Sequence, residues 1–167
     1  MSSHTEVQPE KLAINPFQAI GKDWMLIAAA KGGKTNAMTA SWGGLGVMWG
    51  KNVSFIVIRP QRFTREFVDA SDYYSLNFFG GERRDMLNYF GTVSGRDEDK
   101  AAKTGLTVEQ GDAPYFAEAS TVFLCRKLFC QPYQPESFLL PDLDKTFYPS
   151  KDYHALYIGE VVRVLTK

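Results

Sequence analysis

The sequence has few cysteines and no long apolar segment, and each absence excludes a class of protein. Only two of its 167 residues are cysteine, which is too few for a disulfide framework and fits a reducing compartment. No stretch approaches the roughly 20 apolar residues of a membrane span. The N-terminus MSSHTEVQPEKL lacks the basic and apolar regions of a secretory signal. We therefore expect a cytoplasmic protein that does not enter a membrane.

The chain also lacks an excess of charge of either sign. Lys plus Arg and Asp plus Glu number 19 each, so no overall field attracts a polyanion, and we expect no nucleic-acid partner. A length of 167 residues is typical of one domain, and no shift in composition marks a boundary. We take residues 1–167 as a single domain, in which residues 1–20 are an N-terminal extension.

Motifs of several common enzyme classes are missing as well. Cys125 and Cys130 are five residues apart on one predicted strand, which would place them on opposite faces, and the chain has only two histidines, so we expect no metal site. The glycine-rich segment 43–50 does not fit a dinucleotide-binding fingerprint, because Trp49 would occupy the position of its third glycine. No Ser or Cys elbow indicates a hydrolytic triad.

Short runs of apolar, β-branched and aromatic residues predict six strands along the chain. The expected strands are 24–30, 35–42, 53–58, 73–78, 120–130 and 153–165, and the glycines at 43, 44 and 46 are expected to interrupt pairing. Short helices are expected from about Thr64, over 83–90 and over 97–104, the last capped by Asp97 and closed by Gly105. Because strands dominate, we predict a mainly β barrel with helical excursions.

The predicted strand 35–42 carries polar side chains among small residues. Its alternation places Asn36, Met38, Ala40 and Trp42 on one face, and Ala37, Thr39 and Ser41 on the other. A flat ligand could approach the backbone of such a strand closely and bond its peptide groups. The same pattern also fits an ordinary barrel strand with polar residues facing outward.

The segment Arg59-Pro60-Gln61-Arg62-Phe63-Thr64 follows the third predicted strand and precedes a predicted helix. Two guanidinium groups, a hydroxyl and the free N–H groups of a helix start favour an anion, and a phosphate is the natural occupant. The alternative is a pair of solvated arginines at a strand edge.

Four segments in order resemble the successive motifs of the flavin reductase-like, FMN-binding split-barrel family, which includes flavoredoxin. They are Asn36-Ala-Met-Thr-Ala-Ser-Trp42, Arg59-Pro-Gln-Arg-Phe-Thr64, Tyr74-Ser-Leu-Asn-Phe78 and Asp152-Tyr-His-Ala-Leu-Tyr-Ile-Gly-Glu-Val161. The match covers nearly the whole chain from Trp24 onward. The segment Ser94-Gly-Arg-Asp-Glu-Asp-Lys100 resembles a subgroup of the family rather than its best-known reductases.

The resemblance implies a fold, an assembly and a set of site residues. The fold is a six-stranded antiparallel split β-barrel of Greek-key type with short peripheral helices, and the assembly is a homodimer with one FMN per subunit near the interface. By position, the segment from Asn36 to Trp42 lines the flavin. Arg59, Arg62 and Thr64 hold the phosphate, Phe63 belongs to the same motif, and Asn77 is nearby.

Two residues near the C-terminus carry further expectations. His154 resembles a histidine that can lie near the flavin or nicotinamide in relatives, and apart from the resemblance it is as readily a structural histidine. Gly159, in the middle of the last predicted strand, predicts a bulge or a close backbone approach.

The function that the resemblance implies rests on flavin chemistry, in which the cofactor accepts hydride or electrons while the protein fixes and tunes the ring. Our first hypothesis is an NAD(P)H-dependent flavin reductase, with NADH or NADPH as electron donor. The alternative is a non-catalytic FMN electron carrier that serves a redox protein partner. A third hypothesis is a flavin-free binding module that has kept only the barrel.

Overall fold

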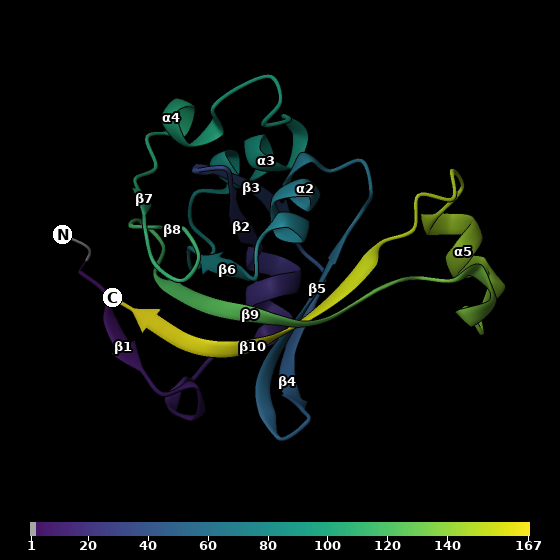
Figure 1. Cartoon of the computed structure of the whole chain (residues 1–167), viewed down its shortest axis with the longest axis horizontal. Coiled ribbons are helices and arrows are strands. Elements are labelled where there is room, and N and C mark those ends of the chain that lie inside the picture. Colours follow the sequence, from purple (N-terminus) through teal and green to yellow (C-terminus); the bar gives the residue numbers. More distant parts are fainter. Residues whose placement is uncertain (1–2) are drawn as a thin grey trace.

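Antiparallel strands are the main regular structure of the computed structural model, which describes residues 3–167 (Figure 1). The main sheet has eight strands; its order is β3-β2-β6-β9-β10-β5-β4, and β1 pairs with β10. Its strands are β1 (Thr5–Val7), β2 (Met25–Lys31), β3 (Lys34–Ala40), β4 (Gly44–Met48), β5 (Lys51–Ile58), β6 (Tyr73–Phe78), β9 (Thr121–Pro132) and β10 (Ala155–Thr166). Strands β7 (Val108–Glu109) and β8 (Tyr115–Phe116) form a separate pair. The predicted mainly β architecture is confirmed.

All six predicted strands are present, and the main sheet contains two more. Strand β1 lies in the N-terminal extension and pairs with the end of β10. Strand β4 pairs with β5, although its glycines were expected to interrupt pairing. Only Gly43, directly before this strand, has a backbone that excludes a side chain among these three glycines: its φ is 142°, and a Cβ there would overlap the carbonyl oxygen of Phe55. The glycines within β4 do not prevent its pairing with β5.

Short helices lie at the β2–β3 end of the sheet, on both of its faces (Figure 1). They are α2 (Phe63–Ala70), α3 (Arg84–Thr92) and α4 (Lys100–Thr104). Elsewhere lie α1 (Pro16–Gln18), a π-helical turn (Ala19–Asp23), α5 (Pro141–Phe147) and two 3-10 turns (Pro9–Lys11 and Pro135–Ser137). Helix α4 begins later than predicted, because Asp99 and not Asp97 caps it by accepting from the N–H of Ala102 at 3.0 Å. Gly105 closes this helix as predicted, with φ of 69°.

The side chains of the sheet alternate between two buried clusters. Met25 and Ile27 of β2 and Met38 and Ala40 of β3 belong to the cluster inside the barrel. Ala37 of β3 belongs to a second cluster, to which α3 contributes. The predicted alternation of β3 is therefore confirmed at these positions.

The pairing of β10 with β9 contains the irregularity that Gly159 predicts. The register against β9 shifts between Ile158 and Gly159, and a Cβ at Gly159 would overlap the hydroxyl of Tyr74. Both expected features, a bulge and a close backbone approach, are present.

The same bulge overturns the prediction that Cys125 and Cys130 face opposite sides of the sheet. Cys130 lies opposite Tyr157, whose side chain belongs to the same buried cluster as Cys125. The extra residue in β9 shifts the alternation by one position, so both cysteines lie on one side. Cys125 is buried and Cys130 is exposed, and both are free thiols.

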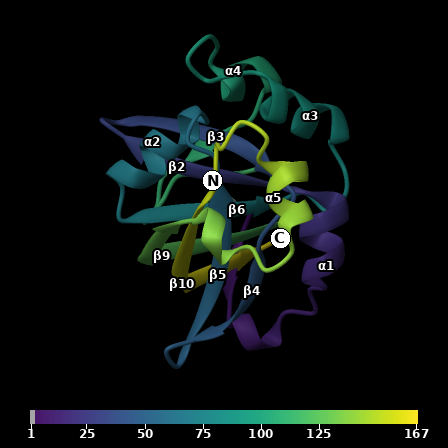
Figure 2. The same cartoon turned by 90° about the vertical axis from the view of Figure 1, so that its right-hand side faces the viewer.

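Residues 133–154, called the arm here, connect β9 to β10 and carry α5 away from the body of the domain (Figure 1). Figure 2 shows the arm from its end, with the β4–β5 hairpin projecting on the side away from α3 and α4. Among residues 3–167, no helix is long and apolar enough to cross a membrane.

Candidate functional site

Arg62 lies at the start of α2 with its guanidinium directed at the end of α3. It donates from Nη1 to the carbonyl of Gly91 at 2.8 Å and from Nη2 to the carbonyl of Phe90 at 3.4 Å. No carboxylate in the described part of the chain pairs with this partly buried cation. Its burial lowers the pKa of Arg62. The group is therefore a positive charge without a counter-charge.

Asn36 and Thr64 join β3 to α2 beside this arginine. Both are buried, and Asn36 Nδ2 donates to Thr64 Oγ1 at 2.8 Å. Gly95 lies over Asn36 so closely that a Cβ there would overlap the amide, and it would lie 3.2 Å from the ring of Phe63. We call Asn36, Arg62, Phe63, Thr64 and residues 94–100 the Arg62 corner.

Lys100, which the sequence reading did not assign, is a second cation in this corner. It is buried at 5% exposure and donates from Nζ to the carbonyl of Phe90 at 3.0 Å, the same oxygen that Arg62 contacts. Burial, and then the charge of Arg62, lower the pKa of Lys100 to about 8. The only sequence signal for it was the family-like segment 94–100.

The Arg62 corner surrounds a cavity of about 220 Å³. A larger cavity of about 750 Å³ adjoins it, and the two share Asn36, Phe63, Gly95, Arg96 and Lys100 in their walls. Arg96 stacks over the Phe63 ring at 4.6 Å and pairs with Glu66 at 2.8 Å. The corner thus offers cations, an amide and hydroxyls around a space that suits a small anion.

Arg59 lies in a different environment, although it is only three residues from Arg62. It forms an ion pair with Asp152 at 2.9 Å, donates to the carbonyl of Phe147 at 2.9 Å and stacks over the ring of Tyr148 at 4.9 Å. All three partners belong to the arm. The structure therefore does not bring Arg59 to the Arg62 corner, and its predicted contact with a phosphate stays a prediction.

His154 lies beside these residues. Its Nδ1 shares a hydrogen bond of 2.6 Å with the hydroxyl of Tyr148, and its ring is 5.3 Å from that of Trp42. Burial, and then the charge of Arg59, lower the pKa of His154 to about 4, so the ring is neutral at pH 7. We call Arg59, Trp42, Tyr148, Asp152 and His154 the Arg59 corner.

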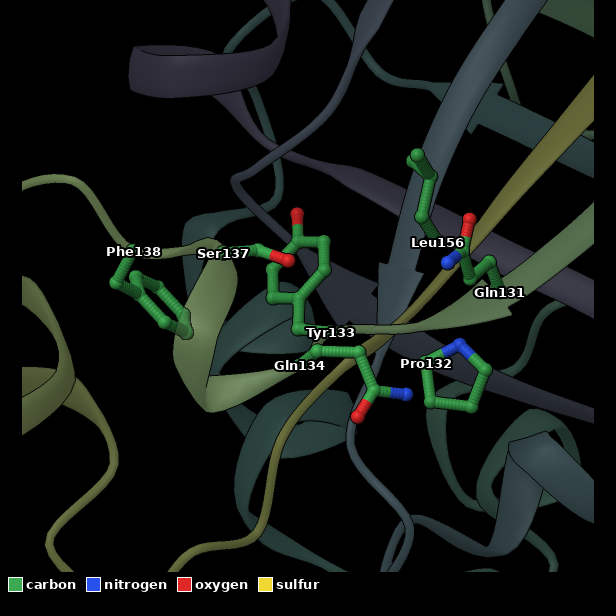
Figure 3. A pocket seen from close by; sticks show the side chains of 7 residues that line it. All are labelled: Gln131, Pro132, Tyr133, Gln134, Ser137, Phe138 and Leu156. Atoms are coloured by element: carbon green, nitrogen blue, oxygen red, sulfur yellow. The ribbon is translucent and has the colours of Figure 1, made fainter.

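Two cavities lie near the Arg59 corner. One of about 290 Å³ lies at the base of the arm, where Tyr133 stands between Phe138 on one side and Gln131 and Leu156 on the other (Figure 3). The ring of Tyr133 is 6.2 Å from that of His154. The other, of about 400 Å³, is lined by Ser41 and Trp42 together with Pro16, Phe17, Ile20, Gly21 and residues 43–45.

The remaining predicted residues of β3 are largely committed to packing. Met38 and Ala40 lie in the barrel core, while Ala37 faces the second cluster. Thr39 donates from its hydroxyl to the carbonyl of Leu87 in α3. The backbone of β3, in contrast, has an unpaired edge, because this strand forms one end of the described main sheet and pairs only with β2. The peptide groups on its outer edge can form hydrogen bonds with a ligand.

Asn77 lies apart from both corners. It is fully buried, and its Nδ2 donates to the carbonyl of Leu26 at 3.3 Å and to Ser75 Oγ at 2.9 Å. Its Oδ1 accepts from the N–H of Phe116 at 3.0 Å. These contacts fasten β8 to the sheet, and the structure does not bring this residue to the other predicted site residues.

The structure is thus a small antiparallel β-barrel domain, with helices on both faces of its β2–β3 end and a cluster of cations beside its edge strand β3. Residues 17–167 match the model of the flavin reductase like domain, and the chain belongs to this family. No curated protein matches the sequence.

Several solved structures share the fold at low sequence identity. An FMN-binding domain of a flavin reductases-like enzyme from Shewanella baltica OS155 is 18% identical with a TM-score of 0.70, covering 99% of this chain and 78% of its own. Flavoredoxin of Desulfovibrio vulgaris (Miyazaki F) is 20% identical with a TM-score of 0.66, covering 86% and 69%. An FMN-binding protein from Thermus thermophilus with bound 1-cyclohex-2-enone is 20% identical with a TM-score of 0.64, covering 84% and 68%. The predicted split-barrel fold is confirmed.

Proposed function

We propose that this protein binds FMN and transfers hydride or electrons through it, as an NAD(P)H-dependent flavin reductase. The observation that carries the proposal is the Arg62 corner, where a partly buried guanidinium lies beside Asn36 and Thr64 without a carboxylate partner in residues 3–167. A cation in such a place favours an anionic ligand. Membership of the flavin reductase like family makes the phosphate of FMN the natural one.

The dimensions of β3 suit the rest of the cofactor. From Asn36 to Trp42 the chain spans about 20 Å at the usual rise of a strand, enough for a ribityl chain and a flavin ring. The free edge of β3 supports hydrogen bonds from peptide groups to the ring. Bound FMN supplies reversible hydride and electron transfer at its ring, and the protein positions and shields it.

The side chains of the two corners have separate tasks in this proposal. The charge of Arg62 and the hydroxyl of Thr64 hold the phosphate, and the amide of Asn36 keeps that hydroxyl in place. Trp42 and His154 lie beyond the other end of β3 and border the space for the ring and the nicotinamide. If Tyr148 donates to Nδ1, neutral His154 carries its proton on Nε2 and can donate a hydrogen bond there.

The visible spectrum of the purified protein and an anaerobic reaction test this function. Protein loaded with FMN should lose its long-wavelength flavin absorbance when NADH or NADPH is added without oxygen. If neither nucleotide lowers this absorbance, the reductase assignment is wrong. If FMN then stayed bound through gel filtration, the electron-carrier alternative would replace it. Protein that binds no FMN at all would contradict both.

We also propose that the protein is a homodimer, with FMN near the interface. Large apolar side chains are exposed at two projecting places: Val47 (69%) and Trp49 (57%) in the β4–β5 hairpin, and Leu139 (91%) and Leu140 (66%) in the arm. Large apolar side chains exposed together on a projecting segment favour a protein interface. Light scattering should give twice the mass of the chain, and a monomer at micromolar concentration would contradict this assembly.

A further inference from the structure

Lys100 and Arg62 bring two positive charges to one backbone oxygen. Both donate to the carbonyl of Phe90, and the Lys100 ammonium also lies 5.0 Å from the centre of the Phe90 ring. A carbonyl and a ring face offset only part of the energy lost when a charge leaves water. Such a pair is more stable when an anion binds between the two cations.

The nearby carboxylates are engaged elsewhere. Glu66 pairs with Arg96 at 2.8 Å, and Glu98 accepts from the hydroxyl of Tyr89. Asp99 caps the first turn of α4 by accepting a backbone N–H at 3.0 Å. Within residues 3–167, neither Arg62 nor Lys100 therefore has a carboxylate partner.

The other groups around the two cations favour an anion as well. Thr64 and Ser94 bring hydroxyls to the wall of the cavity of about 220 Å³. Arg96 is part of both cavity walls, and Lys34 of β3 lies at the wall of the larger one. Besides Lys100, the charged residues in the walls of the two cavities are thus three cations, Arg62, Arg96 and Lys34, and the two engaged carboxylates Glu98 and Asp99.

We propose that Lys100 binds the phosphate of FMN together with Arg62, and that it takes up a proton from solution when FMN binds under alkaline conditions. The proposal rests on the proposed function, because it assigns a residue and a proton to the same site. It goes beyond that function by making cofactor affinity depend on the protonation of one lysine.

The direction of this dependence follows from the charges. In the free protein, burial and Arg62 hold the pKa of Lys100 at about 8, so the side chain loses its proton as the pH rises above that value. A phosphate dianion beside it favours the ammonium form and raises the pKa again. Below about pH 8, Lys100 is protonated in both states; above it, binding requires uptake of a proton, and affinity falls by up to about tenfold per pH unit.

Titration of the apo-protein with FMN, followed by flavin fluorescence between about pH 7 and pH 9.5, tests the proposal without any variant. The FMN phosphate is a dianion throughout this range, since its second pKa is about 6. Riboflavin is the matched control ligand, because it has the same ring and no phosphate. The FMN affinity should be steady up to about pH 8 and then fall, and the riboflavin affinity should not follow it.

Variants of two lysines on α4 sharpen the test. Lys100→Met keeps the length of the side chain and removes its charge, so it should weaken FMN binding about tenfold or more at neutral pH and abolish the fall above pH 8. Lys103→Met, at an exposed position of the same helix, is the control and should match the wild type. Lys100→Arg keeps its charge at high pH and should bind FMN without the alkaline fall.

The outcomes separate this proposal from the function on which it rests. If FMN does not bind to the wild type at all, the proposed function is wrong. If FMN binds but its affinity is level up to pH 9.5, the proton uptake is wrong. If Lys100→Met binds FMN as the wild type does, Lys100 is not a phosphate ligand. If the affinity for riboflavin falls equally above pH 8, the titrating group lies at the ring, and the assignment of Lys100 to the phosphate is wrong.

Discussion

Arg59 and Arg62 belong to one six-residue segment, yet they differ in the negative charge around them. Arg59 has a carboxylate partner, Asp152, and two further contacts in the arm. Within residues 3–167, Arg62 has only two carbonyl oxygens as hydrogen-bond partners, and Lys100 is the second cation that donates to one of them. The charge of Arg59 is neutralised within the protein, and its contacts fasten the arm to the barrel. The charge of Arg62 would be neutralised only by a bound anion, so two arginines of one motif serve different purposes.

Replacing each arginine with alanine tests this comparison directly and should have the largest effect. Arg62→Ala should weaken FMN binding by about 1.5 to 3 kcal/mol, the usual contribution of a hydrogen bond to a charged group, and leave riboflavin binding almost unchanged. Arg59→Ala should weaken FMN binding much less. Fluorescence titration measures both affinities, and thermal unfolding checks that each variant is folded. If the two variants lose FMN affinity equally, both arginines bind the phosphate, as the sequence-based assignment predicts.

Gly95→Ala tests how tightly the Arg62 corner is built. The added methyl group would overlap the side chain of Asn36, which must move and lose its hydrogen bond to Thr64. We expect a loss of stability of about 1 to 3 kcal/mol in urea unfolding, with weaker FMN binding. Gly21→Ala is the control, because no atom lies within 4 Å of its added methyl group. Two variants of equal stability would show that the corner is loose.

The strands were predictable because their side-chain alternation is a local property of the sequence. The six expected strands appear within a few residues, and the two faces of β3 separate as expected. Strand β4 was missed because its glycines indicated a break in pairing, whereas the strand pairs with β5 over its full length and only Gly43, just before it, approaches the backbone of Phe55 closely. The face of Cys130 was wrong because a bulge is a property of two paired strands, and one strand alone does not reveal it.

The candidate site was predictable in part for the same reason. Asn36, Arg62 and Thr64 were expected together and lie together. The surroundings of Arg59 and Lys100 depend on where the arm and α4 lie in the fold, which no local pattern specifies. Arg59 pairs with Asp152 of the arm, and Lys100 is buried beside Arg62. Asn77 was assigned by motif position, and its neighbours in space are Ser75 and the backbone of Leu26 and Phe116.

His154 gives the Arg59 corner its own dependence on pH. Its pKa is about 4 in the folded protein and about 6.5 when unfolded, so the unfolded chain binds more protons between these values. Stability should therefore fall as the pH drops from about 6.5 to about 4, by roughly 1 to 2 kcal/mol because opening of the arm limits the ideal linkage. Urea unfolding across this range should be flatter for His154→Gln. An identical slope in the variant would mean that His154 is already solvated.

Asp152→Asn should have the smallest effect, because an ion pair near the surface contributes little to global stability. The hydrogen bond from Gln61, and with it Arg59, lower the pKa of Asp152, so its contribution is present above the unfolded pKa and lost as the pH falls below about 4. At neutral pH the variant should open the arm slightly more often, because Arg59 keeps its contacts with Phe147 and Tyr148, and trypsin should cut the arm somewhat faster at Lys145 and Lys151. FMN affinity should be unchanged, since the partner of Asp152 is not the arginine that faces the cavity. If Asp152→Asn instead weakens FMN binding as strongly as Arg62→Ala, the two corners form one site and the comparison fails.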